Sequence, residues 1–119
     1  MNNDLNETFK KLDLENYMFS LFIIASLLSI DVNEKARNEY KKEDPHLEDL
    51  RKEYIVIGYL ILFVFIVFLE RNSNNLNKLS KDNEEYEFAK IRLYGSILIV
   101  LGQLLILYYL YNTTTFKNK

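Results

Sequence analysis

The sequence predicts an all-α integral membrane protein, a three-helix up-down-up bundle whose helices extend beyond the bilayer. The 119-residue chain has three long stretches without a charged side chain, at residues 16–30, 54–69 and 93–116. Charged residues make up 27% of the chain and occupy the segments between these stretches, so a hydrophobic content of 49% coexists with a mean hydropathy of only −0.14. One proline and three glycines interrupt the chain, which favours long helices.

The first predicted span covers residues 16–32, inside a helix expected over about residues 12–42. Its 15 uncharged residues are fewer than the roughly 17–25 that a transmembrane helix uses. Lys10 and Lys11 precede it, however, and such long cationic side chains can reach the interface. The alternatives here are an interfacial helix and a cleaved signal peptide. A signal peptide fits less well, because four acidic side chains precede residue 16 whereas a signal peptide begins with net positive charge.

The second predicted span covers residues 54–70 and has no polar face. Between residues 57 and 69, only Gly58 and Tyr59 are neither aliphatic nor phenylalanine. A soluble surface helix needs a polar face at a period of about 3.6 residues. A soluble bundle of this length could bury one such helix, but not three. We expect the helix to begin at Asp44-Pro45, an N-cap acid followed by proline, and to end near residue 71.

The connections between the spans are predicted to lie outside the bilayer. Residues 31–53 should form an extramembrane helical hairpin, in which Asp31 with Lys35 and Glu48 with Lys52 are acid-before-base pairs four residues apart. Residues 72–81 should form a polar loop, because the run Asn-Ser-Asn-Asn at its start favours turns. The third helix should then begin near residues 80–82. Seven lysine and arginine residues lie on the side of the N-terminal segment and the second connection, and eight lie on the side of the first connection and the C-terminal segment. This difference is too small for the positive-inside rule to give a clear orientation.

The third predicted span, residues 93–111, carries a patterned small and polar face. Small residues let helix backbones approach each other, and a buried amide can hydrogen-bond between helices. We expect the small and polar faces of the three spans to meet inside the bundle or to line a pore in an oligomer. The helix-packing or pore-lining candidates are Ala25, Ser26, Ser29, Gly58, Tyr59, Gly95, Ser96, Gly102 and Gln103.

Gln103 should face other helices together with Gly102 and Ser26. An amide without a partner in hydrocarbon is costly, so Gln103 needs one. Ser26 and Tyr59 are the expected partners, because both lie near the middle of their spans. Gly102 is expected at a close helix contact, where a larger side chain would disturb packing.

The sequence shows no pattern of catalytic or metal-binding residues. It has no cysteine, which excludes disulfides and thiolate metal sites, and no HExxH, GxSxG or glycine-rich phosphate loop. The single histidine, His46, lies in a carboxylate-rich run at residues 43–49 that is typical of a helix start. No charged side chain lies within the uncharged stretches at residues 16–30, 54–69 and 93–116, which argues against active transport. We expect no enzyme activity, no cofactor and no metal, and the lack of a clustered basic face argues against nucleic acid as a partner.

The sequence therefore predicts a small, non-enzymatic, multi-pass protein of the cell membrane that acts by helix–helix association, as an accessory subunit or as a homo-oligomer. Its expected partners are the lipid bilayer and either a second copy of the chain or another membrane protein. The alternative is a homo-oligomeric pore-forming protein of holin-like size, or a channel. In that alternative, the faces that contain Ser26, Gly102 and Gln103 line water in the oligomer.

Overall fold

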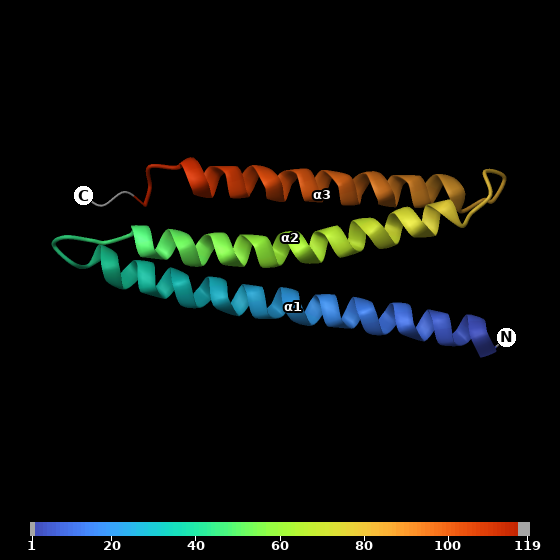
Figure 1. The fold of residues 1–119 in the computed structure, drawn as a ribbon, viewed down its shortest axis with the longest axis horizontal. Helices are drawn as coiled ribbons and strands as arrows, with labels where there is room; N and C mark the ends of the chain where they lie inside the picture. The colour runs from blue at the N-terminus through green and yellow to red at the C-terminus, as the bar shows by residue number, and fades with distance from the viewer. Residues whose placement is uncertain (1, 117–119) are drawn as a thin grey trace.

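The computed structural model describes residues 2–116, and these form three long helices and no strand. The helices are α1 (Asn2–Tyr40), α2 (Glu48–Asn77) and α3 (Tyr86–Asn112). They run antiparallel in up-down-up order, so that the start of α1 and the end of α3 lie at opposite ends of the bundle (Figure 1). The predicted all-α, three-helix architecture is confirmed. All three helices are long enough and apolar enough to cross a membrane.

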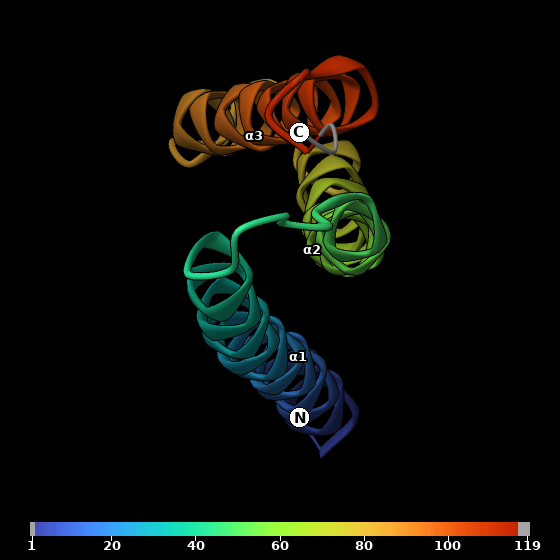
Figure 2. The same cartoon turned by 90° about the vertical axis from the view of Figure 1, so that its left-hand side faces the viewer.

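Helix α2 lies between the other two and forms the contacts that hold the bundle together. It packs against α1 on one side and α3 on the other, whereas no Cα atom of α1 comes within 8 Å of a Cα atom of α3 among the described residues. The end-on view in Figure 2 shows the result: α1 and α3 leave α2 in different directions. The Cα atoms span 65 × 26 × 15 Å, so the molecule is long and thin.

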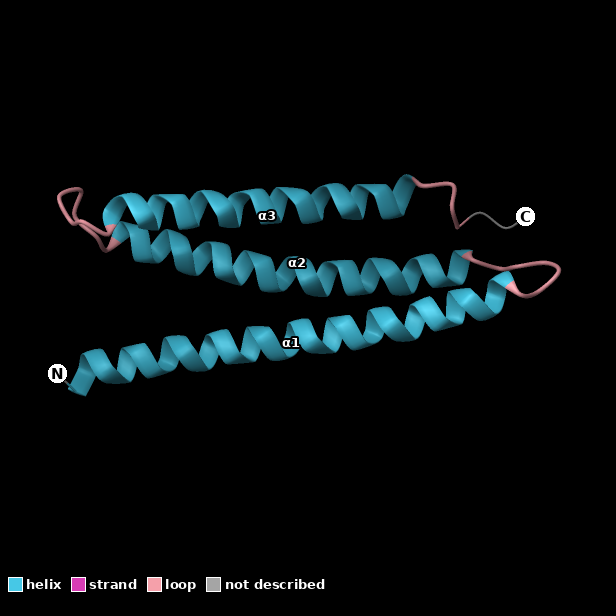
Figure 3. Ribbon diagram, turned by 180° about the vertical axis from the view of Figure 1, so that it is seen from behind, coloured by secondary structure: helices cyan, strands magenta, loops and turns pink. Residues whose placement is uncertain are grey.

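The connections are confined to the two ends of the bundle, where Figure 3 shows the loops in pink. In the first connection, the predicted helix start at Asp44-Pro45 is wrong. Helix α2 begins at Glu48, with Leu47 at the N-cap position. The side chain of Leu47 is 2% exposed and belongs to the same buried cluster as Val32. Burial of this leucine between α1 and α2 therefore positions the start of the helix, and Pro45 remains in the loop.

The second connection is also displaced from its predicted position. The polar loop expected at residues 72–81 is wrong in its first half, because α2 continues to Asn77. The cause is tertiary: Asn72 is 6% exposed and donates a hydrogen bond to Ser96 on α3, which keeps it within the helix pair. The turn occupies residues 78–85, where the Asn83 side-chain oxygen accepts a hydrogen bond from the backbone N–H of Glu85 (2.8 Å). Helix α3 therefore begins at Tyr86, later than predicted.

The first connection is tied to the end of α1 by one carboxylate. Glu39 accepts hydrogen bonds from the Lys42 ammonium (2.7 Å) and from the backbone N–H of His46 (3.1 Å). These bonds, that from Lys42 first, hold the pKa of Glu39 below its usual value of 4.5. A carboxylate whose pKa is lower in the folded state stabilises that state above the unfolded pKa, and this contribution is lost as the pH falls through the folded pKa.

We therefore expect the first connection to loosen under acid conditions, starting below about pH 4.5. The amide chemical shift of His46, measured by NMR, should titrate in the acid range as the bond from its N–H to Glu39 is lost. The Glu39→Gln variant should abolish this titration, because an amide cannot change charge. Glu34→Gln should leave it in place, because Glu34 pairs with Arg37 on α1 and not with the connection. A His46 shift that titrates equally in the Glu39→Gln chain would contradict the assignment.

Candidate functional site

At Gly58, the seam between α2 and α3 leaves no room for a side chain. A Cβ atom at this position would lie 2.6 Å from Cδ2 of Leu107, which is far inside normal contact distance. The absence of a side chain also exposes the backbone carbonyl of Gly58 to α3. Gln103, which is 6% exposed, donates its side-chain amide to that carbonyl oxygen over 3.0 Å. Gly58 and Gln103 are thus brought together at the centre of the helix pair.

The partner expected for Gln103 was wrong. The amide pairs with a backbone carbonyl of α2, and neither Ser26 nor Tyr59 takes that place. The physical reason is the central position of α2, which separates α1 from α3 and leaves Ser26 out of reach. The Tyr59 hydroxyl instead lies 3.0 Å from the Tyr111 hydroxyl. Tyr59 therefore also bridges α2 and α3, at a different level.

Gly95 and Gly102 are not close contacts within the bundle. A Cβ atom placed at either position meets no other atom within 4 Å. The close approach that was expected at Gly102 occurs at Gly58 on the other helix. Ser96 differs from both, since it is 8% exposed, accepts a hydrogen bond from Asn72 and donates one to the Arg92 carbonyl of its own helix (3.1 Å).

On α1, a line of residues spaced seven apart faces α2. Met18, Ala25 and Val32 are 2%, 0% and 1% exposed. Ser26 lies beside this line and is exposed, so it does not face another helix as expected. Its hydroxyl and that of Ser29 donate to carbonyls of their own helix over 2.9 Å. Ala25 is therefore the predicted residue that α1 contributes to the packing face.

A layer of ionic and polar contacts closes one end of the bundle. Glu15 on α1 pairs with Arg71 on α2 (2.9 Å) and more distantly with Arg92 on α3 (3.8 Å). Next to it, the Asn72 amide donates to the Ser96 hydroxyl. Sequence reasoning missed this layer, although a signal was present. Glu15, Arg71 and Arg92 each lie close to one end of an uncharged stretch. The up-down-up order of the helices brings these three ends to the same end of the bundle.

Arg51 closes the opposite end. Its guanidinium donates hydrogen bonds to two carbonyl oxygens in the last turn of α3, those of Leu110 (3.2 Å) and Tyr111 (2.7 Å). It also donates to the carbonyl oxygen of Thr113, just after the helix (2.8 Å). The side chain is 14% exposed and lies 5.5 Å from the Phe116 ring centroid. A helix leaves its last carbonyls without partners, and a cation there also complements the helix dipole. Arg51 therefore fixes the end of α3 to the start of α2.

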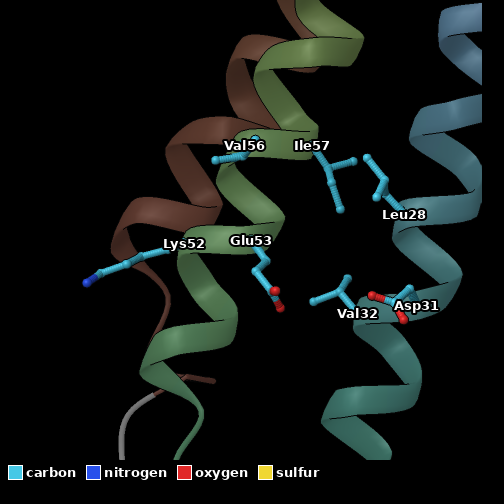
Figure 4. Close-up of a pocket in the computed structure, with 7 residues that line it drawn as sticks. All are labelled: Leu28, Asp31, Val32, Lys52, Glu53, Val56 and Ile57. Atoms are coloured by element: carbon cyan, nitrogen blue, oxygen red, sulfur yellow. The ribbon is translucent and has the colours of Figure 1, made fainter.

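Between α1 and α2 at this end lies an apolar pocket with carboxylates at its rim (Figure 4). Lys35 pairs with Asp31 (3.3 Å), as predicted, and with Glu53 across the helix pair (2.8 Å). The hydrogen bond from Lys35 to Glu53, then that to Asp31, raises the pKa of the lysine above its usual value of 10.5. Glu48 does not take its predicted partner Lys52 but pairs with Arg51 (3.2 Å). The ion pair between Lys35 and Glu53 thus joins α1 to α2 at this end.

No known protein family, curated protein or solved structure matches this chain. Within residues 2–116, no group of three histidine, aspartate or glutamate side chains is placed to hold a metal ion. Three of the described ion pairs join different helices: Lys35 with Glu53 at one end of the bundle, and Glu15 with Arg71 and with Arg92 at the other. Between these ends, Gln103 makes a helix–helix hydrogen bond to the Gly58 carbonyl.

Proposed function

We propose that this chain is a small, non-enzymatic, multi-pass protein of the cell membrane that acts by association, with a second copy of the chain as its first partner. The observation that carries the proposal is the uncovered glycine face of α3. Gly95 and Gly102 have no neighbouring atom within 4 Å of a Cβ position, although both lie on a helix that is long and apolar enough to cross a membrane. Such a face admits a second helix at close range.

The exposed apolar surface supports a membrane location. Large apolar side chains remain uncovered along whole helix faces: for example, Leu98 and Leu105 on α3 are 68% and 70% exposed, and Ile23 and Leu27 on α1 are both 60% exposed. Soluble monomers rarely expose contiguous apolar patches larger than a few hundred Å². In a bilayer the same surface faces lipid, and the charged layers at the two ends of the bundle lie at the interfaces.

The geometry of α3 supports self-association in particular. The two glycines are seven residues apart, which places them on the same side of the helix two turns apart. Helix α1 does not cover this side, because its backbone stays away from α3. Without a hydrophobic driving force in lipid, helices associate through close backbone packing, which small residues permit. The glycine face thus has the shape that such contacts use.

We expect Gly102→Leu to weaken self-association at least about tenfold, which corresponds to about 1.4 kcal/mol. The bundle itself should remain folded, because the new side chain enters open space. Crosslinking in native membranes and single-molecule counting in liposomes measure the change. Leu104→Phe is the matched control, since residue 104 lies on the opposite side of α3 and is already 45% exposed. A native chain that stays monomeric and without partners in the membrane would contradict the proposal.

The pore alternative receives less support from the side chains that it requires. Gln103 is 6% exposed and is engaged by the Gly58 carbonyl. The Ser26 hydroxyl bonds to its own helix. A water-filled channel would therefore lack the amide that was expected to line it. Ion leak from liposomes that contain the purified chain is the measurement that would favour the pore.

A further inference from the structure

A cavity opens beside the polar layer, where all three helices contribute to its lining. Its volume is about 260 Å³, whereas a single water molecule needs only about 10–15 Å³ of such space. The polar part of the lining consists of Glu15, Asn72, Arg92 and Ser96. The cavity is therefore large enough for a chemical group of many atoms, and it lies at the level where the uncharged stretches of the chain end.

Asn72 lines this cavity and has an unused hydrogen-bond acceptor. The residue is 6% exposed, and its amide nitrogen donates to Ser96. Its side-chain oxygen is buried and has no donor in the described part of the chain. A buried acceptor without a donor destabilises the folded chain, because its lost hydration is not replaced. A ligand that brings an O–H or N–H group to this oxygen would offset that loss.

Arg92 supplies an available cation at the same place. Glu15 is committed mainly to Arg71, at 2.9 Å, and lies 3.8 Å from Arg92. The Arg92 side chain is 58% exposed. One carboxylate between two guanidiniums leaves the cluster with a net positive charge. An anionic group therefore complements it better than a zwitterion does.

The rest of the lining is apolar. Phe19 and Phe68, whose ring centroids are 5.7 Å apart, form part of the wall together with Phe65 and Ile99. These residues belong to the uncharged stretches and lie toward the middle of the helices. A ligand that fills the cavity thus has an anionic, donor-bearing head and an apolar tail, which is the chemistry of a membrane lipid and not of free phosphate.

We propose that this cavity binds an anionic phospholipid with a hydroxylated headgroup, of the phosphatidylglycerol type. The phosphate pairs with Arg92, a headgroup hydroxyl donates to the side-chain oxygen of Asn72, and an acyl chain lies along Phe68 and Ile99. The inference rests on the membrane location in the proposed function and is independent of self-association through α3.

Native mass spectrometry of the full chain in detergent tests this, because it resolves lipid adducts and oligomers separately. The probes share the same acyl chains: phosphatidylglycerol; phosphatidylmethanol, which has the same charge but no hydroxyl; and phosphatidylcholine, a zwitterion without a donor. Phosphatidylglycerol should bind about fivefold more tightly than phosphatidylmethanol, the factor that one hydrogen bond of about 1 kcal/mol provides. Phosphatidylcholine should bind most weakly. Equal affinity for phosphatidylglycerol and phosphatidylmethanol would overturn the proposal, because it would show that no headgroup hydroxyl donates to Asn72.

Two pairs of variants assign the effect to residues. Asn72→Leu should abolish the preference for phosphatidylglycerol over phosphatidylmethanol, whereas Ser96→Ala, which breaks the same helix–helix bond but keeps the acceptor, should retain it. Arg92→Gln should weaken both anionic lipids, and Arg37→Gln, an exposed arginine at the other end of the bundle, should weaken neither. A preference that survives Asn72→Leu would contradict the site. Competition by glycerol 3-phosphate as strong as that by the lipid would contradict a lipid ligand. A chain that binds phosphatidylglycerol selectively but remains monomeric would contradict only the proposed self-association.

Discussion

The Gly58→Val variant should lose about 1–3 kcal/mol of stability, the range typical of extra methyl groups forced into a packed interior. A Cβ atom at this position would already lie 2.6 Å from Cδ2 of Leu107 and 3.6 Å from the Gln103 amide nitrogen. Valine adds two further carbons and is stiff about χ1, so a rotation of the Leu107 end cannot clear the space. The variant should also displace the Gln103 amide from the carbonyl that it contacts. The midpoint of SDS-induced unfolding in mixed micelles, followed by circular dichroism, measures the loss.

Gly102→Val is the matched control for this experiment. Both variants replace a helical glycine by valine, so the change in intrinsic helix propensity is the same in each. A Cβ atom at Gly102 meets nothing within 4 Å, and at a dilution where the chain is monomeric the control should change stability by no more than about 0.5 kcal/mol. Equal losses in the two variants would show that α2 and α3 do not meet at Gly58.

The second large effect is expected at Arg51. Replacement by methionine keeps much of the side-chain volume but removes every hydrogen bond to the end of α3. Hydrogen bonds from a charged donor are worth about 1.5–3 kcal/mol each before water replaces them at the exposed carbonyls. We therefore expect Arg51→Met to cost about 2–3 kcal/mol in the same unfolding assay. Amide hydrogen exchange should become faster in the last turn of α3 before the rest of the helix responds.

Two further variants define the specificity of this effect. Lys52→Met removes a neighbouring positive charge that is exposed, and it should leave both the unfolding midpoint and the exchange in α3 unchanged. Arg51→Lys should be intermediate, because one ammonium cannot reproduce the fork of donors that reaches the three carbonyls. If exchange at residues 107–113 is the same in the Arg51→Met chain as in the native chain, the arginine does not hold the end of α3.

The number, order and approximate position of the helices could be predicted from the sequence. Three uncharged stretches separated by charged segments define membrane-compatible helices, because hydrophobicity adds up along the chain and needs no knowledge of neighbours. The buried state of Ala25, Gly58, Ser96 and Gln103 accords with their small or polar character on apolar helices. These properties are local, which is why the residues themselves reveal them.

The partners of these residues depended on the rotation of each helix about its own axis. Gln103 pairs with the Gly58 carbonyl and not with Ser26, because α2 occupies the centre of the bundle. No periodicity within a single helix determines which neighbour it faces. For the same reason, the sequence could not distinguish Gly58, which lies against Leu107, from Gly102, which faces open space.

Asn72 illustrates the limit most clearly. Its local sequence favours a turn, and on propensity alone it belongs in a loop. Burial against α3 and the hydrogen bond to Ser96 outweigh that preference and keep the residue helical. Intrinsic propensities differ by less than about 1 kcal/mol per residue, whereas leaving a buried amide without a partner costs more than that. The sequence alone thus determined three apolar helices and their order. The tertiary structure decided which polar groups meet, because pairing energies between helices exceed the local preferences that sequence patterns report.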